Sequence, residues 1–348
     1  MNKSAQKVKI GIIGCGTVAG YGHLPTVAVH PDCELYAIAE IDKKRLKEVG
    51  ELYSIPLEQR FSDYKKLLAL PEVEVVTIST RVEQHRQVVL DTAKAKKQIF
   101  CEKPIAPTVA DGWEMVEAAK KANVFLLINL HMRVKSSINL MLDYLRQNQI
   151  GKLHTIRMVH LWCGADNTPR ADGRSRRDLL SEEGGGPIVD CGVHFFDIAR
   201  LFAGSDYQQI NAIGQWVEKK YSNPGHVISS CVFKNGIICI NEQSWVYTNT
   251  SKSKKTVHQI ELIGTQGLIS AYWDWDPKLQ KYHGEKVQLF NADGFKETVH
   301  DVGKPFEEMY HRLAKMVRIG KKDPNLAFGE DGILAMEAAL TALNKCKT

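Results

Sequence analysis

Apolar and polar positions follow two different periods along the first third of the chain. Stretches 64–68 and 82–94 have the spacing of helices. Short apolar runs typical of buried strands lie between such stretches, at 8–13, 34–39, 73–80 and 98–101. Strands that alternate with helices predict a parallel, doubly wound sheet, whose ligands bind at the carboxyl ends of the strands.

The pattern changes after Asn129. A helical period over 136–149 is followed by runs that predict strands joined by hairpin turns. The predicted strands are 153–162, 227–233, 237–246 and 257–263, with turn residues at 234–236 and 264–267. The last two helical stretches, 306–318 and 332–344, are amphipathic, so we expect them to pack as cover.

The length of 348 residues exceeds one ordinary core, so we predict two domains. The first is an α/β dinucleotide-binding domain over 1–128, and the second is a substrate-binding and oligomerisation domain over 129–348. A broad sheet that helices cover on one face only leaves an apolar patch in a monomer. We therefore expect a homodimer or homotetramer through the sheet of the second domain.

Composition excludes several classes of protein. The net charge of +6 is spread along the chain without long Lys/Arg runs, which argues against nucleic acid as a partner. Eight cysteines without a C-x-x-C pair argue against a structural zinc site, and no metal is expected. Residues 1–7 have no apolar run of the kind found in a secretory leader, and no stretch approaches roughly 18 apolar residues, so we expect a cytoplasmic protein with reduced thiols and no membrane partner.

A glycine turn follows the first predicted strand and has the pattern G-x-G-x-x-A. It consists of Gly14, Cys15, Gly16, Thr17, Val18 and Ala19. In a dinucleotide fold Gly14 allows the tight turn, Gly16 lets a pyrophosphate approach the backbone, and Ala19 lets helix and strand pack closely. Glycine-rich turns are common in proteins, so this turn alone is equally compatible with a purely structural role.

The choice of cofactor depends on the end of the second predicted strand. Glu40 stands where an acid accepts hydrogen bonds from a ribose 2′-OH and repels a 2′-phosphate, which favours NAD. Asp42 is a second candidate for this role. The basic run 43–45 leaves NADP open, although a solvated helix start is the preferred interpretation of it.

Candidate catalytic groups lie in two separate segments. Pro187 suits the first turn of a helix, and a helix from there places Asp190 and His194 four residues apart on one face. A carboxylate in that position orients an imidazole and supports its protonated form. The strand at 98–101 delivers Glu102-Lys103-Pro104 to the ligand-binding edge of the parallel sheet. Each segment by itself is better explained by ordinary surface charges.

These segments together resemble the Gfo/Idh/MocA oxidoreductases, named for glucose-fructose oxidoreductase and inositol dehydrogenase. The resemblance covers nearly the whole chain, and its Glu-Lys-Pro and Asp-x-Gly-x-His elements are its most specific parts. It rests on the glycine turn, His23-Leu24-Pro25, Thr80 with His85, Glu102-Lys103-Pro104, Gly184-Gly185-Gly186, and Asp190-Cys191-Gly192-Val193-His194. It implies an N-terminal Rossmann domain followed by an α+β domain with a large, open, mainly antiparallel sheet.

The resemblance also implies roles for individual residues. Lys103, Asp190 and His194 match the catalytic trio of the family, with the nicotinamide between the two domains. The residues expected to bind the cofactor are Gly14, Gly16, Thr17, Val18, Ala19, Glu40, Thr80, Arg81, His85, Glu102 and Lys103. Arg81 departs from the family, whose members commonly have proline there. It contacts an anionic substrate or simply replaces the proline, and the structural alternative is preferred.

On the substrate side, Arg133 matches an arginine that this family often keeps near the substrate. His131 is a further candidate, with a hydrogen-bonded structural histidine as the alternative. Lys103, Asp190 and His194 complete the predicted substrate contacts. The segment 166–177 has the composition of an exposed loop and contains four arginines between Arg170 and Arg177. It either overhangs the active site or forms a solvated face or an oligomer contact.

The resulting hypothesis is an NAD(P)-dependent oxidation of a secondary hydroxyl on a sugar, sugar derivative, glycoside or cyclitol. His194 or Lys103 accepts the hydroxyl proton, and Asp190 orients His194. Two alternatives from other classes remain. One is a glycosidase or lyase that oxidises and re-reduces a sugar on a retained NAD, and the other is a regulator that binds a dinucleotide without catalysis.

Overall fold

The computed structural model describes residues 6–162, 178, 184–247, 252, 255–276, 278 and 281–347. The chain divides into two compact units: unit 1 comprises Met1–Val134 and Lys304–Ile333, and unit 2 comprises Lys135–Gly303 and Leu334–Thr348. The chain first passes from unit 1 to unit 2 after Val134, close to the boundary at 128/129 that the sequence suggested. The continuous domain proposed over 129–348 did not anticipate that 304–333 return to unit 1.

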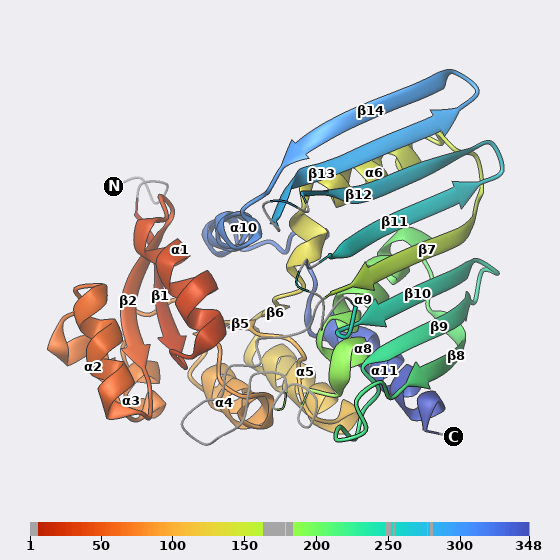
Figure 1. Ribbon diagram of the computed structural model, residues 1–348. Coiled ribbons are helices and arrows are strands. Elements are labelled where there is room, and N and C mark those ends of the chain that lie inside the picture. The colour runs from red at the N-terminus through yellow and green to blue at the C-terminus, as the bar shows by residue number, and fades with distance from the viewer. Residues whose placement is uncertain are drawn as a thin grey trace. The chain divides into compact units, whose positions relative to one another are not determined.

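Unit 1 is built on a six-stranded sheet in which every neighbouring pair is parallel (Figure 1). The order β3-β2-β1-β4-β5-β6 is that of a Rossmann fold. The strands are β1 Val8–Ile13, β2 Cys33–Ala39, β3 Arg60–Phe61, β4 Val75–Ile78, β5 Gln98–Cys101 and β6 Leu126–Ile128. The prediction of a doubly wound parallel sheet is confirmed.

Helices cover both faces of this sheet, because its strands are apolar on both sides. The helices are η2 Ala19–His23, α1 Leu24–Val29, α2 Lys43–Leu52, η3 Leu57–Gln59, α3 Tyr64–Leu68, α4 Val82–Lys94, α5 Val109–Ala122, η4 His131–Val134 and α10 Pro305–Ile319. A further helix, α11, spans Gly329–Cys346. On one face of the sheet, the Leu67 side chain of α3 packs against the backbone of β1 at Gly11. Successive contacts join α3 to α4 and α4 to α5 on that face.

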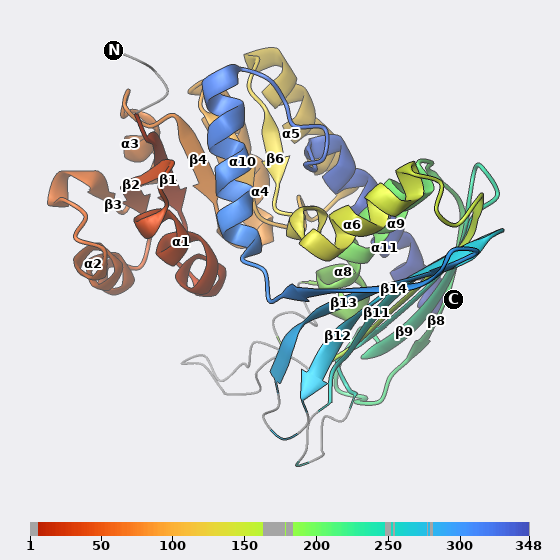
Figure 2. The ribbon, with the colours of Figure 1, turned by 90° about the horizontal axis from the view of Figure 1, so that it is seen from above.

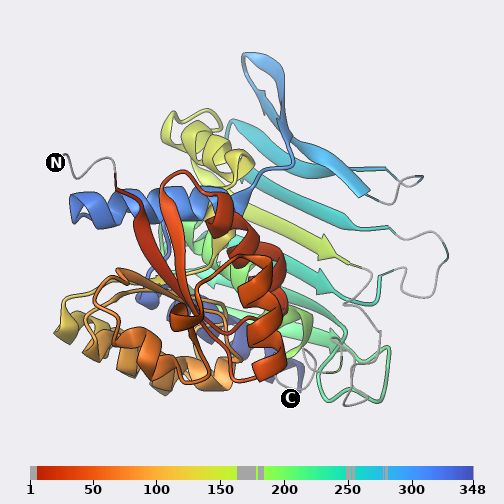
Figure 3. The same ribbon diagram turned by 90° about the vertical axis from the view of Figure 1, so that its left-hand side faces the viewer.

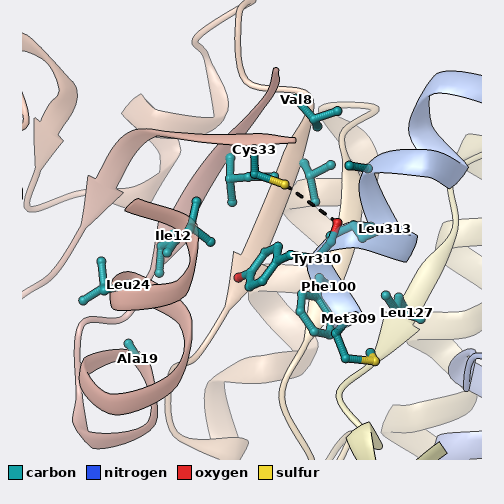
Figure 4. Packing of buried hydrophobic residues seen from close by; sticks show 14 of the residues in the cluster. Val8, Ile12, Ala19, Leu24, Cys33, Phe100, Leu127, Met309, Tyr310 and Leu313 are labelled. Carbon is teal, nitrogen blue, oxygen red and sulfur yellow. Dashed lines mark hydrogen bonds between the residues drawn. The ribbon is translucent and has the colours of Figure 1, made fainter. Parts of the chain in front are cut away.

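The opposite face carries α1 and, from far along the chain, α10. In Figure 3 α10, coloured blue, runs beside the red N-terminal strands. Its Tyr310 and Leu313 are fully buried against Ile12 and Phe100 in one cluster (Figure 4). The amphipathic pattern correctly predicted a covering helix, and this helix covers the Rossmann sheet.

Unit 2 is built on an eight-stranded sheet in the order β14-β13-β12-β11-β7-β10-β9-β8. Every neighbouring pair is antiparallel except β7 with β10, which confirms the mainly antiparallel second sheet. The strands are β7 Leu153–Leu161, β8 Tyr207–Gln215, β9 His226–Phe233, β10 Ile238–Ser244, β11 Val257–Gly264, β12 Gly267–Asp276, β13 Lys281–Asn291 and β14 Gly294–Asp301.

In the part of the chain that the structure describes, helices pack on one face of this sheet only. Helices α6 Ser136–Arg146, α8 Gly186–Asp190 and α9 Gly192–Ala203 pack on the same side (Figure 2). On the opposite side, alternate residues such as Ile228, Ile238 and Ile240 stay 41–47% exposed in the described part of the chain. Side chains of a strand alternate between faces, so these isoleucines belong to one broad uncovered surface.

Candidate active site

The glycine turn lies at the carboxyl end of β1 and is shaped by two glycines. Gly14 has a φ of +87°, and a Cβ there would lie 2.6 Å from the carbonyl oxygen of Ser79, so no other residue fits without a shift. A Cβ on Gly16 would meet no heavy atom within 4 Å. Thr17 and Val18 then begin the helix that continues through η2, with Ala19 fully buried. The turn therefore leaves open space where a pyrophosphate would approach.

Glu40 closes this turn from the neighbouring strand. The backbone N–H of Cys15 donates to Glu40 Oε2 at 2.7 Å, and the N–H of Asp42 donates to Oε1 at 3.0 Å. These two bonds hold the carboxylate beside the glycine turn with lone pairs to spare for ribose hydroxyls. The residues present thus fit a dinucleotide: an open glycine turn with an anchored acid next to it.

Other candidates for cofactor choice have different surroundings. The Asp42 side chain caps α2 by accepting from the N–H groups of Lys44 and Arg45, which gives it a structural partner. Lys43 and Lys44 are exposed, as expected of a solvated helix start. Arg45 differs from them, because its Nε donates to the Cys15 carbonyl at 2.9 Å and so ties α2 to the glycine turn.

We expect Glu40→Ser to reduce the preference for NAD over NADP, measured as the ratio of the two kcat/KM values, by roughly tenfold or more. The substitution removes a charged acceptor for ribose hydroxyls and the repulsion of a 2′-phosphate. The ratio cancels any general loss of activity. Glu34→Ser, on the exposed start of the same strand, is the matched control. An unchanged ratio in Glu40→Ser would place cofactor choice elsewhere.

The loop after β4 contributes Thr80, Arg81 and His85. His85 is buried on α4, with Nδ1 3.1 Å from the Pro104 carbonyl and Nε2 3.3 Å from the Thr80 carbonyl. Burial lowers the pKa of His85, which favours a neutral ring. A neutral ring donates to only one of these carbonyl groups, and His85 lies between the two loops that follow β4 and β5. The Arg81 side chain is 57% exposed, and its Nε lies 3.7 Å from Glu83 Oε2.

Lys103 follows β5 at the same edge of the sheet. Its side chain is partly exposed, whereas the neighbouring Glu102 is buried. The backbone N–H of Lys103 donates to Glu102 Oε2 at 3.1 Å. Unit 1 therefore gathers the glycine turn, the β4 loop and Lys103 at the carboxyl ends of β1, β4 and β5.

His131 and Arg133 occupy η4 of unit 1. The Arg133 guanidinium is buried, donates to the Leu326 carbonyl at 3.1 Å and pairs with Asp331, also at 3.1 Å. The His131 ring stacks on Phe306 with centroids 5.6 Å apart. Both therefore have structural contacts that compete with their predicted roles in binding substrate.

Asp190 and His194 lie in unit 2, but the single helix predicted for them is wrong. Asp190 is the last residue of α8, and Cys191 interrupts the helix before α9 begins at Gly192. Gly185 and Gly186, with φ of +71° and +73°, provide the turn before α8. Both Asp190 and His194 are less than a tenth exposed. The predicted loop 170–177 lies outside the described residues.

Sequence reasoning missed a row of polar and aromatic side chains on the helix-covered face of the unit 2 sheet. This polar row consists of Gln243, His160, His258, Trp273 and Glu285. Its members lie on adjacent strands: Gln243 and His258 both pair with His160, and Trp273 pairs with Glu285. The ring of His258 stacks on Trp273 at 4.3 Å, and Trp273 Nε1 donates to Glu285 at 3.0 Å.

The polar row is adjacent to the predicted catalytic residues of unit 2. Phe195, next to His194, contacts the rings of His160 and His258 at 5.3 and 5.5 Å. Burial and the charge of Lys135 lower the pKa of His160 to about 4, against the opposing effect of Asp190. Asp190 is therefore close enough to act electrostatically on this row. One signal in the sequence could have indicated this row. His160 in β7 and His258 in β11 occupy inward positions that are otherwise apolar in these alternating strands.

The fold and the open glycine turn with its acid define a dinucleotide-binding oxidoreductase, and the sequence comparisons identify the family. Residues 8–130 match the model of the oxidoreductase family with an NAD-binding Rossmann fold, and residues 138–270 match the GFO/IDH/MocA C-terminal domain. The chain belongs to the GFO/IDH/MocA oxidoreductases. The predicted family, the class of enzyme and the nicotinamide cofactor are thereby confirmed.

Individual relatives match over most of their length. Myo-inositol 2-dehydrogenase of Thermotoga maritima is 27% identical over 340 residues, 94% of this chain and 93% of the relative. The 1,5-anhydro-D-fructose reductase of Ensifer adhaerens is 30% identical over 287 residues, 82% and 80% of the two chains. The crystal structure of a probable dehydrogenase from Thermotoga maritima matches with a TM-score of 0.78 at 25% identity, over 98% of this chain and 97% of that one.

Across the described residues no helix is both long and apolar enough to span a bilayer.

Proposed function

We propose that this protein oxidises, reversibly and with NAD, a secondary hydroxyl of a sugar, sugar derivative, glycoside or cyclitol. The observation that carries the proposal is that one chain holds both an anchored acid beside an open glycine turn and the complete set Lys103, Asp190 and His194. The names of its relatives, a myo-inositol dehydrogenase and an anhydrofructose reductase, favour a polyol substrate.

The nicotinamide, when bound, accepts the hydride. The chain's own residues manage the proton and the orientation of the substrate. An imidazole suits proton removal at neutral pH, so His194 is the proposed base, with Asp190 orienting it. Lys103 donates a hydrogen bond to the reacting oxygen and stabilises the negative charge that develops there. Lys103 is also the alternative proton acceptor.

The polar row extends this proposal to recognition of the substrate. Neutral histidines offer one donor and one acceptor each, which matches the hydroxyls of a polyol. Gln243 is fully buried and its Nε2 donates to Asn241 Oδ1 at 2.7 Å, so it supports the row from behind. The indole of Trp273 supplies an aromatic surface. Arg133 and His131 are weaker candidates for contact with the substrate than the polar row. The Arg133 side chain already pairs with Asp331, and the His131 ring stacks on Phe306.

We also propose that two or four copies associate through the uncovered face of the unit 2 sheet. Its exposed isoleucines would otherwise form an apolar patch in water. Light scattering across the elution peak of a sizing column measures the mass in solution. A monomer mass at micromolar concentration would contradict this proposal.

Seven described cysteines are free thiols, in keeping with the cytoplasmic location that the sequence suggests.

A panel of polyols, aldoses and glycosides tested with NAD and NADP checks the proposed function. The absorbance of the reduced cofactor is the readout, and chromatography of the products is followed in parallel. We expect net formation of NADH with at least one free polyol or sugar. Cleavage of a glycoside without net NADH would instead identify the glycosidase or lyase alternative. Absence of any turnover together with tight binding of a dinucleotide would identify the regulator.

A further inference from the structure

A chain of buried polar side chains lies behind Lys103 in unit 1. Its centre is Glu102, the residue that directly follows β5. Oε1 of Glu102 is 2.9 Å from Nε2 of His23 and 2.5 Å from Nδ2 of Asn129. On its other side His23 Nδ1 is 2.9 Å from the hydroxyl of Tyr310, which is in turn 2.9 Å from Thr77 Oγ1. Tyr310 itself is packed among apolar side chains of α10 and the sheet (Figure 4).

The donors and acceptors of this chain fit together in one consistent direction. With a neutral His23 that donates to Glu102, the assignment that satisfies each contact has Thr77 donating to the Tyr310 oxygen and the Tyr310 hydroxyl donating to Nδ1 of His23. His23 carries its proton on Nε2 and donates it to Glu102. Burial alone would raise the pKa of Glu102, but the hydrogen bonds from His23 and Asn129 and the positive charge of Lys103 outweigh it and lower this pKa to about 2. Glu102 is therefore a buried anion directly beside Lys103.

Glu102 has little capacity left for a ligand. Oε1 already accepts from His23 and Asn129, and Oε2 accepts from the backbone of Lys103. Only 6% of the residue is exposed. A direct contact with the cofactor, which the sequence suggested, is thus a poorer explanation of this carboxylate than a role toward Lys103.

We propose that Glu102 is a positioning residue that fixes the backbone of Lys103 and holds its amine in the charged form, and that Tyr310 supports this role through His23. The proposal rests on the assignment of Lys103 to the reaction proposed above. A helix more than 200 positions away in the sequence would then influence the reacting group without touching the substrate.

The electrostatic part of the proposal has a definite sign. An anion near an ammonium favours its charged form, and a partly buried pair such as Glu102 and Lys103 is screened by salt less than an exposed pair. Removal of the Glu102 charge should therefore let Lys103 lose its proton at lower pH. The other titratable groups near Glu102 are His23 of η2, Tyr310 of α10, His85 of α4 and Cys101 of β5. Burial lowers the pKa of His85 and raises those of Cys101 and Tyr310, which keeps these three neutral near pH 7.

Competitive acetylation tests the proposal without relying on turnover. The full-length protein is labelled with acetic anhydride across a pH series, and mass spectrometry follows the peptide that contains Lys103. We expect the titration midpoint of Lys103 to move down by about one pH unit or more in Glu102→Gln. Tyr310→Phe keeps the ring in the core and should give a smaller shift in the same direction. This smaller shift should disappear in the Glu102→Gln background.

Tyr144→Phe, at a buried tyrosine of unit 2, is the control and should leave the midpoint unchanged. Thermal unfolding identifies variants that are folded at the labelling temperature. An unchanged Lys103 midpoint in folded Tyr310→Phe and Glu102→Gln would overturn the proposal. A shifted midpoint supports it even if no substrate is found, so failure of the proposed function and failure of this inference give different results. With a substrate, the pH profile of kcat should shift in the same direction.

Discussion

Lys103→Met is expected to lower kcat by roughly a thousandfold, within the range that a positioned proton donor or acceptor contributes. Methionine keeps the length of the side chain but has neither charge nor N–H groups, so the reacting oxygen loses its partner. Because Lys103 is only partly buried at the end of β5, the fold should tolerate the change. The measurement is steady-state oxidation of the substrate found in the panel, with NADH binding followed by fluorescence.

The matched control is Lys97→Met, which removes a lysine from the other end of the same strand. Lys97 is partly buried and donates to the Leu70 carbonyl at 2.8 Å, so its loss is structural. We expect it to affect thermal stability more than kcat. Turnover of Lys103→Met within a few fold of the wild type would remove Lys103 from the reaction. Loss of NADH binding in parallel with turnover would point instead to a cofactor contact.

His194→Gln and Asp190→Asn are expected to lower kcat by about a hundredfold or more with little change in NAD affinity. Glutamine keeps hydrogen-bonding capacity but cannot accept the hydroxyl proton, and asparagine removes the charge that supports a protonated imidazole. A base must be deprotonated to act. The wild-type rate should therefore fall as the pH decreases, and this acid limb should be lost in His194→Gln. Rates at several pH values measure both effects.

Suitable controls lie on the surface of the same unit. His154→Gln changes an exposed histidine of β7, and Asp206→Asn changes a carboxylate paired with Arg200. Neither should alter kcat. Because Asp190 and His194 are nearly buried, unfolding temperatures are needed to separate lost catalysis from lost structure. Full activity in both His194→Gln and Asp190→Asn would show that Asp190 and His194 are not catalytic and that α8 and α9 have only a structural role.

The parallel sheet could be predicted because its signals are local. The run over β1 ends directly in a glycine turn, and the strands before α4 and after it are continuous apolar runs. The turn at Gly14 needs a left-handed φ, which only glycine adopts at low cost, so its position in the sequence is informative. The same reasoning located Glu40 and Lys103 at strand ends.

Features that depend on tertiary contacts could not be predicted. The sequence from Pro187 to His194 has helical spacing throughout, yet a turn at Cys191 separates α8 from α9, although Cys191 keeps right-handed helical angles, with φ of −89° and ψ of −38°. Helical spacing also could not tell which sheet α10 covers, because an amphipathic face fits any apolar surface. The polar row joins residues from five strands, and its register becomes visible only when the strands are paired.

The return of α10 to unit 1 has a consequence for how the protein is made. Tyr310, Leu313 and Met309 complete the core between β1 and β5, but they emerge from the ribosome only after the whole sheet of unit 2. During synthesis the dinucleotide-binding half therefore waits with part of one apolar face uncovered until α10 emerges. Transiently exposed apolar surface of this kind favours aggregation in that interval. A gene fragment that ends at Val134 would encode a domain without part of its own core.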